Sequence, residues 1–151
     1  MKIGIIGNGF VGSSVAFGFS PQTGCEADVK IYDKNPSKGT HSLSETLESD
    51  FIFVSVPTPS NKDGSINLDI VYECFNEMNE LNNRTDNVFL LRSTVTPGTT
   101  MELQKKYPDL NIVFNPEFLT ERSANFDFIN QARFILGGEK KNTNKVADLY
   151  R

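Results

Sequence analysis

The sequence has little of several things, and each scarcity excludes a class of protein. Two cysteines are too few for a disulfide scaffold, which favours a reducing compartment and a cytoplasmic location. No apolar run approaches the roughly 18 residues of a membrane-spanning helix, and the apolar start at Ile3–Ile6 ends too soon for a secretory signal. With 15 basic and 19 acidic residues, the net charge of −4 argues against a protein built to coat nucleic acid or an anionic membrane.

What remains is an ordinary globular composition. The chain has 151 residues, of which 38% are hydrophobic and 23% charged, close to the averages of globular domains. A chain of this length can bury a core of its own. Because no linker, repeat or low-complexity tract divides it, we expect residues 1–151 to form one domain.

Short apolar runs of strand length recur along the chain. Several contain no polar residue, as expected for strands that helices cover on both faces. The six runs expected to form strands are Ile3–Ile6, Val29–Tyr32, Phe51–Val56, Val88–Leu91, Ile112–Phe114 and Phe134–Leu136.

Between these runs, the spacing of apolar residues predicts helices. From Asp69 to Leu81 they fall at i, i+3, i+4, i+7 and i+10, on one face of a helix. Helices are also expected over Val11–Phe19 and Pro97–Tyr107, and a last one should open near Thr143 and still be running where the sequence stops. The alternation predicts an α/β fold: a Rossmann-type, doubly wound parallel sheet of about six strands in three α/β/α layers.

The first expected strand leads into the glycine-rich sequence Gly7-Asn8-Gly9-Phe10-Val11-Gly12, and a helix follows. In such a loop Gly7 allows the tight turn, Gly9 lets the backbone approach a pyrophosphate, and Gly12 lets helix and strand pack closely. Asp33 ends the second strand, 21 residues after Gly12, where a carboxylate accepts both ribose hydroxyls of an adenosine. The pattern predicts a dinucleotide site that favours NAD over NADP. The alternative is a glycine turn and a surface aspartate that bind nothing.

Three further loops follow expected strands, at the edge where open α/β sheets bind ligands. They contain Pro57-Thr58-Pro59, the hydroxyl-rich stretch Arg92–Thr100, and Asn115–Glu121 with two carboxylates four residues apart. Each has a plainer interpretation as a strand end, a helix cap or a solvated turn.

Taken together, the motifs resemble the N-terminal NAD-binding domain of the UDP-glucose/GDP-mannose dehydrogenase family. They occur in the family's order and span nearly the whole chain. The matching pieces are the glycine loop, Val56-Pro57-Thr58-Pro59, Asp63-Gly64-Ser65, Ser93–Thr99, Asn115-Pro116-Glu117-Phe118-Leu119 and Arg133-Phe134-Ile135-Leu136-Gly137-Gly138.

The resemblance implies a two-step, NAD-dependent oxidation of the C6 alcohol of a nucleotide sugar to a carboxylate, as from UDP-glucose to UDP-glucuronate. It implies that Thr94, Glu117 and Glu121 act in catalysis, and that Phe118 and Leu119 offer backbone groups to the sugar. The cofactor contacts that the loop chemistry and the resemblance imply are Gly7, Gly9, Phe10, Val11, Gly12, Asp33, Thr58 and Thr94.

The resemblance also indicates what these residues lack. The family's second oxidation uses a cysteine nucleophile, with a lysine and an asparagine, from a C-terminal half; its central dimer helix and UDP-binding domain also have no counterpart here. Cys74 is expected in the core and Cys25 away from the cofactor. We therefore expect no catalysis by this chain alone, unless a partner chain supplies the missing half, and self-association stays open.

The sequence departs from the family pattern at several positions. Only 22 residues separate Asp33 from Val56, where the family has a longer segment, and His41 in this stretch is expected to be solvated. Thr120 and Arg122 replace the family's usual arginine and glycine, which weakens the expected sugar contacts more than the cofactor contacts. No cluster of histidine, cysteine or carboxylate has metal-site spacing, so no metal is expected.

Two other functions share parts of the pattern. A nucleotide-sensing regulatory module would use the same glycine loop and Asp33, but it would not need Pro57-Thr58-Pro59 or Asn115–Leu119. A dehydrogenase of 3-hydroxy acids shares the amino-terminal fold, and the later loops fit it less well.

Overall fold

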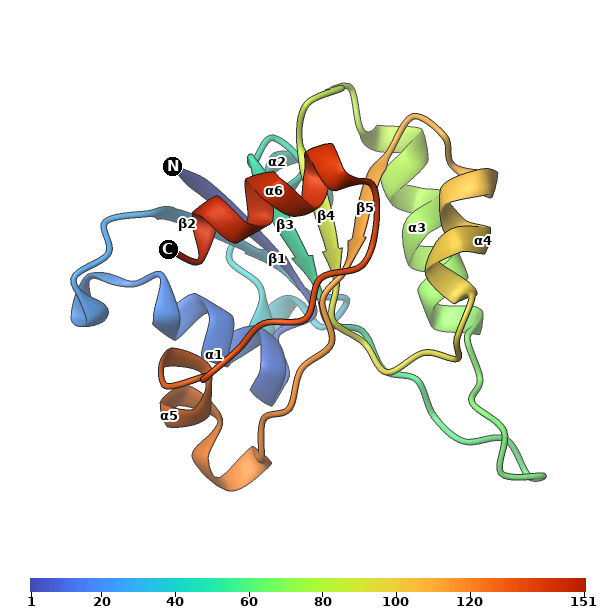
Figure 1. Ribbon diagram of the computed structural model, residues 1–151, viewed down its shortest axis with the longest axis horizontal. Helices are drawn as coiled ribbons and strands as arrows, with labels where there is room; N and C mark the ends of the chain where they lie inside the picture. Colours follow the sequence, from blue (N-terminus) through green and yellow to red (C-terminus); the bar gives the residue numbers. More distant parts are fainter.

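The computed structural model describes residues 1–151 as strands and helices alternating around one sheet (Figure 1). The strands are β1 (Lys2–Ile6), β2 (Asp28–Tyr32), β3 (Phe51–Val54), β4 (Val88–Leu91) and β5 (Asn111–Phe114). The α-helices are α1 (Phe10–Gly18), α2 (Leu43–Thr46), α3 (Asp69–Leu81), α4 (Thr99–Lys106), α5 (Ala124–Ile129) and α6 (Lys140–Leu149). Single 3-10 turns lie at η1 (Pro21–Thr23), η2 (Pro36–Lys38) and η3 (Glu121–Ser123).

All strand pairs are parallel, in the order β2-β1-β3-β4-β5. The chain moves from β1 outward to β2 and then returns to the other side of β1. The strand order therefore reverses between β1 and β3. In an open α/β sheet such a switch point is where a ligand binds, outside the carboxyl ends of the strands. The glycine loop leaves β1 at this point.

Helices cover both faces of the sheet, in the three layers predicted (Figure 1). On one face, strand residues such as Ile52 and Phe89 pack with α3 and α4 through Phe75 and Leu103. On the other face, a second cluster joins the strands to α1, α5 and α6, for example through Phe128. β3 and β4 are almost wholly buried, which explains why their sequences are continuously apolar. β2, at the edge of the sheet, is half-buried and alternates between polar and apolar residues. None of the helices combines the length and apolar character needed to cross a membrane.

The prediction of six strands was wrong, because the sheet has five. The Phe134–Leu136 segment forms no strand. The residue after it, Gly137, makes one antiparallel bridge to β5, in which it exchanges hydrogen bonds of 2.7 and 2.9 Å with Phe114. The segment's own groups are used differently. The Phe134 ring stacks on Tyr150 with centroids 3.7 Å apart, and the Ile135 carbonyl accepts the side-chain amide of Asn115 at 3.1 Å.

The helix predictions fared better. α3 has the predicted bounds, and α1 and α4 lie within two residues of theirs. The last helix was misplaced: it begins at Lys140 after the N-cap Glu139, and it ends at Leu149, before the end of the chain. Thr143 therefore lies inside α6, and its hydroxyl donates to the Lys140 carbonyl at 3.2 Å instead of capping the helix.

The short connection between β2 and β3 contains a single helical turn, α2. A capping box between Ser42 and Glu45 fixes its start, each side chain bonding the other's backbone amide at 3.2 Å. α2 lies directly on β1, because a Cβ on Gly4 would come within 2.8 Å of the Thr46 carbonyl. His41 bonds Thr40 beside this turn and is half-buried rather than fully solvated.

Candidate functional site

The three glycines of the loop after β1 meet different surroundings. Gly7 has φ +90°, and a Cβ there would lie 2.3 Å from the Ser55 carbonyl; a Cβ on Gly12 would lie 1.9 Å from the Gly7 carbonyl. The fold itself therefore requires both glycines. A Cβ on Gly9 would have no heavy atom within 4 Å. The space in front of Gly9 is open, which fits the close approach of a pyrophosphate.

Helix α1 begins directly after Gly9 and presents its first amides at this open space. No side chain caps its N-terminus, and its first turn contains no acidic residue. The first four N–H groups of a helix have no partner inside the helix, and its dipole makes this end positive. The start of α1 can therefore receive phosphate groups without displacing a protein partner.

Asp33 lies next to the glycine loop at the end of β2. Its Oδ2 accepts the Asn8 amide and its Oδ1 accepts the Asn35 amide, each at 2.8 Å. Each carboxylate oxygen retains a further lone pair. The carboxylate is therefore held in place and is still able to accept ribose hydroxyls.

A cavity of about 330 Å³ adjoins these groups; we call it the glycine-loop cavity. Its wall includes Gly7, Gly9 and Asp33, and its apolar parts come from Val56 and Pro57 after β3 and from Ile70 and Cys74 on α3. Apolar walls beside a carboxylate suit a nucleobase attached to its ribose. The cavity, the open Gly9 and the free start of α1 together fit NAD.

Sequence reasoning missed the contribution of α3 to this cavity. Cys74 was expected in the core, and it does pack against the core cluster, but it also lines the cavity. Burial raises the pKa of its thiol to about 12, with the Glu77 carboxylate adding to the effect and Lys34 opposing it. The signal in the sequence was its place at the edge of the apolar stripe of α3.

The loops after β3 and β4 are joined by Ser93. Its Oγ accepts the Val56 amide at 3.0 Å and donates to the Val56 carbonyl at 2.8 Å. This pair of bonds extends the β3–β4 pairing beyond the strands and brings the two loops together. Thr58 and Thr94, one on each loop, are half-buried and exposed respectively.

The candidate residues in the loop after β5 do not converge on one pocket. Glu117 is half-buried, and its Oε2 accepts the Leu119 amide at 2.6 Å. That amide, expected to serve the sugar, is thus already engaged inside the loop. The Phe118 side chain is 62% exposed. Glu121 is exposed and borders a different hollow, together with Phe10. The structure does not bring the two carboxylates into one pocket.

A buried polar cluster, absent from the sequence predictions, lies behind these loops. Arg92 is 1% exposed, and its Nη1 donates to Asn115 Oδ1 at 2.7 Å, which also accepts the Tyr150 hydroxyl at 2.6 Å. The guanidinium lies 5.6 Å from the centre of the Phe128 ring, while its Nε and Nη2 have no partner. Burial lowers the pKa of Arg92, with Tyr150 and Glu117 opposing, and it raises the pKa of Tyr150 to about 12. The only signal was a charged residue directly after an apolar strand.

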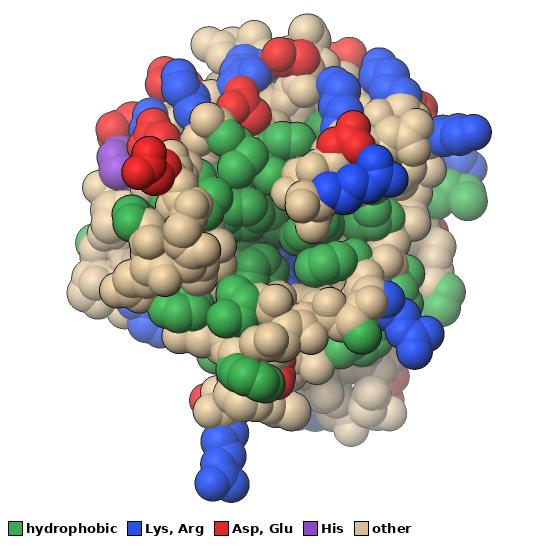
Figure 2. All heavy atoms as spheres, turned by 60° about the vertical axis from the view of Figure 1, so that its left-hand side comes forward, with side chains coloured by type: hydrophobic (Ala, Val, Ile, Leu, Met, Phe, Trp, Pro, Cys, Tyr) green, Lys and Arg blue, Asp and Glu red, His purple; other side chains and the backbone are tan.

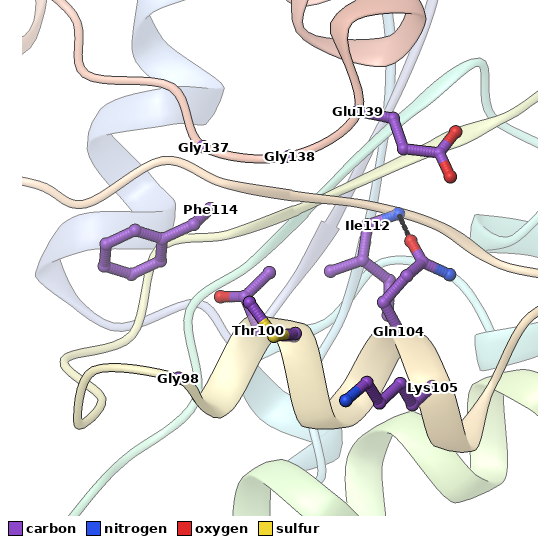
Figure 3. A pocket seen from close by; sticks show the side chains of 10 residues that line it. Gly98, Thr100, Gln104, Lys105, Ile112, Phe114, Gly137, Gly138 and Glu139 are labelled. Carbon is purple, nitrogen blue, oxygen red and sulfur yellow. Dashed lines mark hydrogen bonds between the residues drawn. The ribbon is translucent and has the colours of Figure 1, made fainter.

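The larger cavity, of about 570 Å³, lies elsewhere, between α4 and the open edge of β5 (Figure 3). Gln104 reaches across it from α4: its Oε1 accepts the Ile112 amide at 3.0 Å and its Nε2 donates to the Leu110 carbonyl at 2.6 Å. These bonds occupy the free edge of the sheet. None of the predicted cofactor or catalytic residues lines this cavity.

Several large apolar side chains are exposed on the surface. Figure 2 shows hydrophobic side chains gathered around a hollow on one face, with charged side chains towards its upper rim. Large apolar side chains that are at least half exposed include Met101, Phe118, Phe126 and Ile129. No group of three or more histidine, cysteine, aspartate or glutamate residues is arranged to hold a metal ion.

Comparison with known proteins identifies the family to which this chain belongs. Residues 38–151 match the family described as UDP-glucose/GDP-mannose dehydrogenase family, NAD binding domain. An uncharacterized protein of Methanocaldococcus jannaschii is 31% identical over 99% of this chain and 20% of its own length. The UDP-glucose 6-dehydrogenase of Haloferax volcanii is 29% identical over 92% of this chain and 41% of its own length.

A solved structure shows the same fold. The GDP-mannose dehydrogenase of Pseudomonas aeruginosa, crystallised as a ternary complex, superposes on 99% of this chain and 44% of that one, with a TM-score of 0.84 and 23% identity. The chain thus spans less than half the length of these relatives. The Methanocaldococcus alignment covers 178 positions, more than the 151 residues present here, so that relative carries residues with no counterpart. The chain belongs to the UDP-glucose/GDP-mannose dehydrogenase family, as its NAD-binding domain.

Proposed function

We propose that this chain binds NAD across the carboxyl edge of its sheet, with the pyrophosphate at the start of α1 and the adenosine in the glycine-loop cavity. The observation that carries the proposal is the position of the Asp33 carboxylate, which the Asn8 amide holds at 2.8 Å. This contact supports a role for Asp33 as a ribose acceptor beside the phosphate-binding loop. Gly9, open in front, completes the path between the two.

The same carboxylate sets the preference for NAD. Both oxygens of Asp33 accept backbone amides, an arrangement suited to an ionised group. A 2′-phosphate would place a second anion beside it, and like charges at short range repel. NADP is therefore expected to bind more weakly than NAD.

We further propose that the complete protein oxidises the C6 alcohol of a nucleotide sugar such as UDP-glucose. NAD supplies the hydride acceptor. Thr94 and Glu117 belong to the loops beside the expected nicotinamide position. Glu117, whose Oε2 accepts the Leu119 amide, would handle a proton or a water. Glu121 is assigned to the reacting carbon, and the backbone of Phe118 and Leu119 to the sugar.

Catalysis by these residues requires groups from outside them. A covalent second oxidation needs a reactive thiolate, and Cys74 does not provide one because burial raises the pKa of its thiol to about 12. We propose that a further part of the protein, or a partner chain, supplies the nucleophile and completes the sugar site. Both cysteines are free, which supports a reducing, cytoplasmic environment.

Calorimetric titration of the purified chain with NAD, and separately with NADP, tests the proposal. We expect saturable binding of NAD, weaker binding of NADP, and loss of about 1.5–3 kcal/mol or more of NAD affinity in Asp33→Ala, since hydrogen bonds to a charged group are removed. Circular dichroism checks that the variant is folded. A folded wild-type chain that binds neither dinucleotide would overturn the proposal.

A second variant separates an enzyme domain from a nucleotide sensor. In the complete protein, Glu117→Gln should reduce oxidation of the nucleotide sugar while NAD affinity stays within about twofold, because proton transfer by a placed side chain contributes about 10²–10⁴ in rate. A sensor would show no dependence on Glu117. Unchanged turnover would remove Glu117 from the catalytic assignment.

A further inference from the structure

Asn8 occupies the variable position between Gly7 and Gly9, and it bonds in two directions. Its backbone amide donates to Asp33 Oδ2 at 2.8 Å. Its side-chain Nδ2 donates to the Lys38 carbonyl, also at 2.8 Å. One residue of the glycine loop is thereby tied to both ends of the segment 33–38, which follows β2.

The segment 33–38 forms a wall of the glycine-loop cavity. Asp33, Lys34 and Lys38 line that cavity, as do Gly7 and Gly9, whereas Asn8 does not. Asn8 therefore lies behind the wall, where it holds the two sides of the cavity together without facing its interior. Its Oδ1 is buried without a partner. The Nδ2 bond to the Lys38 carbonyl is therefore the interaction that holds the side-chain amide in place.

This tie lies beside a short connection between two strands. The connection from β2 to β3 has only the one-turn helix α2, and the segment returns along the β2 edge, where the Thr40 and His41 amides both donate to the Ile31 carbonyl. A short connection offers few contacts to hold residues 34–38 against the glycine loop. The Asn8 side chain supplies one directly at the cavity.

We propose that Asn8 is a positioning residue, which sets the spacing between the phosphate-binding loop and the ribose-binding segment of the NAD site. The inference rests on the proposed function and deepens it. Asn8 acts through Asp33 and Lys38 and touches no ligand. Its side chain should therefore matter for ligands that span both sides of the cavity, and not for those that occupy one side.

The experiment compares two ligands on three chains. NAD spans the phosphate and ribose sides, whereas adenosine has no phosphate and uses only the ribose side and the cavity. Asn8→Leu replaces the amide by two methyl groups with the same branching of heavy atoms. The matched control is Asn130→Leu, which removes another bond from an asparagine amide to a backbone carbonyl, that of Phe126 at 2.9 Å, on α5. Calorimetry measures NAD, NMR titration measures adenosine, and thermal unfolding measures stability.

We expect Asn8→Leu to weaken NAD binding about tenfold, the effect of losing one hydrogen bond, while adenosine affinity changes less than about twofold. Asn130→Leu should leave both affinities unchanged at a similar loss of thermal stability. Equal losses for NAD and adenosine, or wild-type affinity for both, would overturn the inference while leaving NAD binding intact. If the Asn8→Leu chain does not fold, Asn8 is needed for folding rather than for positioning the site, and the inference is also overturned. If the wild-type chain binds no NAD, both proposals fail.

Discussion

The carboxyl edge of the sheet has two sides that differ in how completely they are built. The adenosine side, residues 7–12 and 32–38, is closed by short hydrogen bonds between Asn8, Asp33 and Lys38 around a defined cavity. The β4–β5 side, residues 92–100 and 115–121, has exposed Thr94 and Glu121 side chains and a buried guanidinium with two unpartnered nitrogens.

The contrast follows from local and distant contacts. The adenosine side joins a tight loop to a neighbouring strand. The Asn8 and Asn35 amides bond Asp33, and the Asn8 side chain bonds the Lys38 carbonyl. The β4–β5 side relies on Phe128 of α5 and on Tyr150 after α6, which meet at Arg92. A buried charge among neutral partners is costly. We propose that the adenosine side is preorganised for its ligand, whereas the β4–β5 side is organised chiefly for the fold.

The largest effect is expected from breaking the glycine loop. Gly12→Ala places a Cβ 1.9 Å from the Gly7 carbonyl, and we expect it to cost about 3 kcal/mol or more of the free energy of unfolding, through overpacking against backbone. Urea denaturation measures the change. Wild-type stability in this variant would contradict the packing described here.

Gly9→Ala is the matched control on the same loop. Gly9 has φ −78°, which alanine adopts, and free space around it, so stability should stay within about 1 kcal/mol of wild type. NAD affinity should nevertheless fall about tenfold or more, because the Cβ would occupy the path of the pyrophosphate. Undiminished NAD binding would place the cofactor elsewhere.

The alkylation rate of the Cys74 thiol, on α3, measures how accessible the glycine-loop cavity is. Because burial raises its pKa to about 12, its alkylation at pH 8 in a Cys25→Ser chain should be at least about a hundredfold slower than in urea, and NAD should slow it further. The unfolded thiol ionises near pH 8.5 and the folded one does not, so this group lowers stability as pH rises from about 8.5 towards 12. Labelling at the unfolded rate would show that Cys74 is not buried.

On the β4–β5 side, a smaller change in stability is expected without a change in binding. Tyr150→Phe removes the hydroxyl that donates to Asn115 at 2.6 Å, and it should cost about 1–2 kcal/mol. NAD affinity should stay within about twofold, since Tyr150 lies behind the loops. Thermal unfolding and calorimetry on the same sample measure the two. If Tyr150→Phe lowered the free energy of NAD binding by more than the free energy of unfolding, the β4–β5 side and the adenosine side would be energetically coupled.

The smallest effect is expected at Glu121. Its side chain is exposed and borders a hollow apart from the glycine-loop cavity. Glu121→Gln should leave stability within about 0.5 kcal/mol and NAD affinity within about twofold. A calorimetric change beyond that would show that the nicotinamide already contacts this side in the chain alone.

Much of the fold could be predicted from local sequence. Short apolar runs identified all five strands, and the periodic stripe from Asp69 to Leu81 identified α3 to the residue. The sixth strand failed because Phe134 and Leu136 have strand character but pack on Tyr150 and the core instead. Nothing in the run itself distinguishes these partners.

For the candidate site too, the features that depend on local sequence could be predicted, and those that depend on distant contacts could not. The places of Gly7, Gly12 and Asp33 after β1 and β2 could be predicted because they depend on neighbours a few residues away or on the adjacent strand. The Arg92 cluster and the lining of the cavity by Cys74 depend on contacts across 50 or so residues, such as that between Arg92 and Tyr150. Only the folded chain brings those residues together, so spacing alone does not reveal them.

The most direct test of the account is an amide NMR titration of the isotopically labelled chain with NAD. The account predicts saturable shifts at Gly9, Phe10, Val11 and Gly12 and at Asp33 and Lys34, larger than those at Glu117–Glu121. A folded chain whose glycine-loop amides do not move at saturating NAD, or whose shifts gather around Gln104 and Ile112 at the β5 edge, would contradict it.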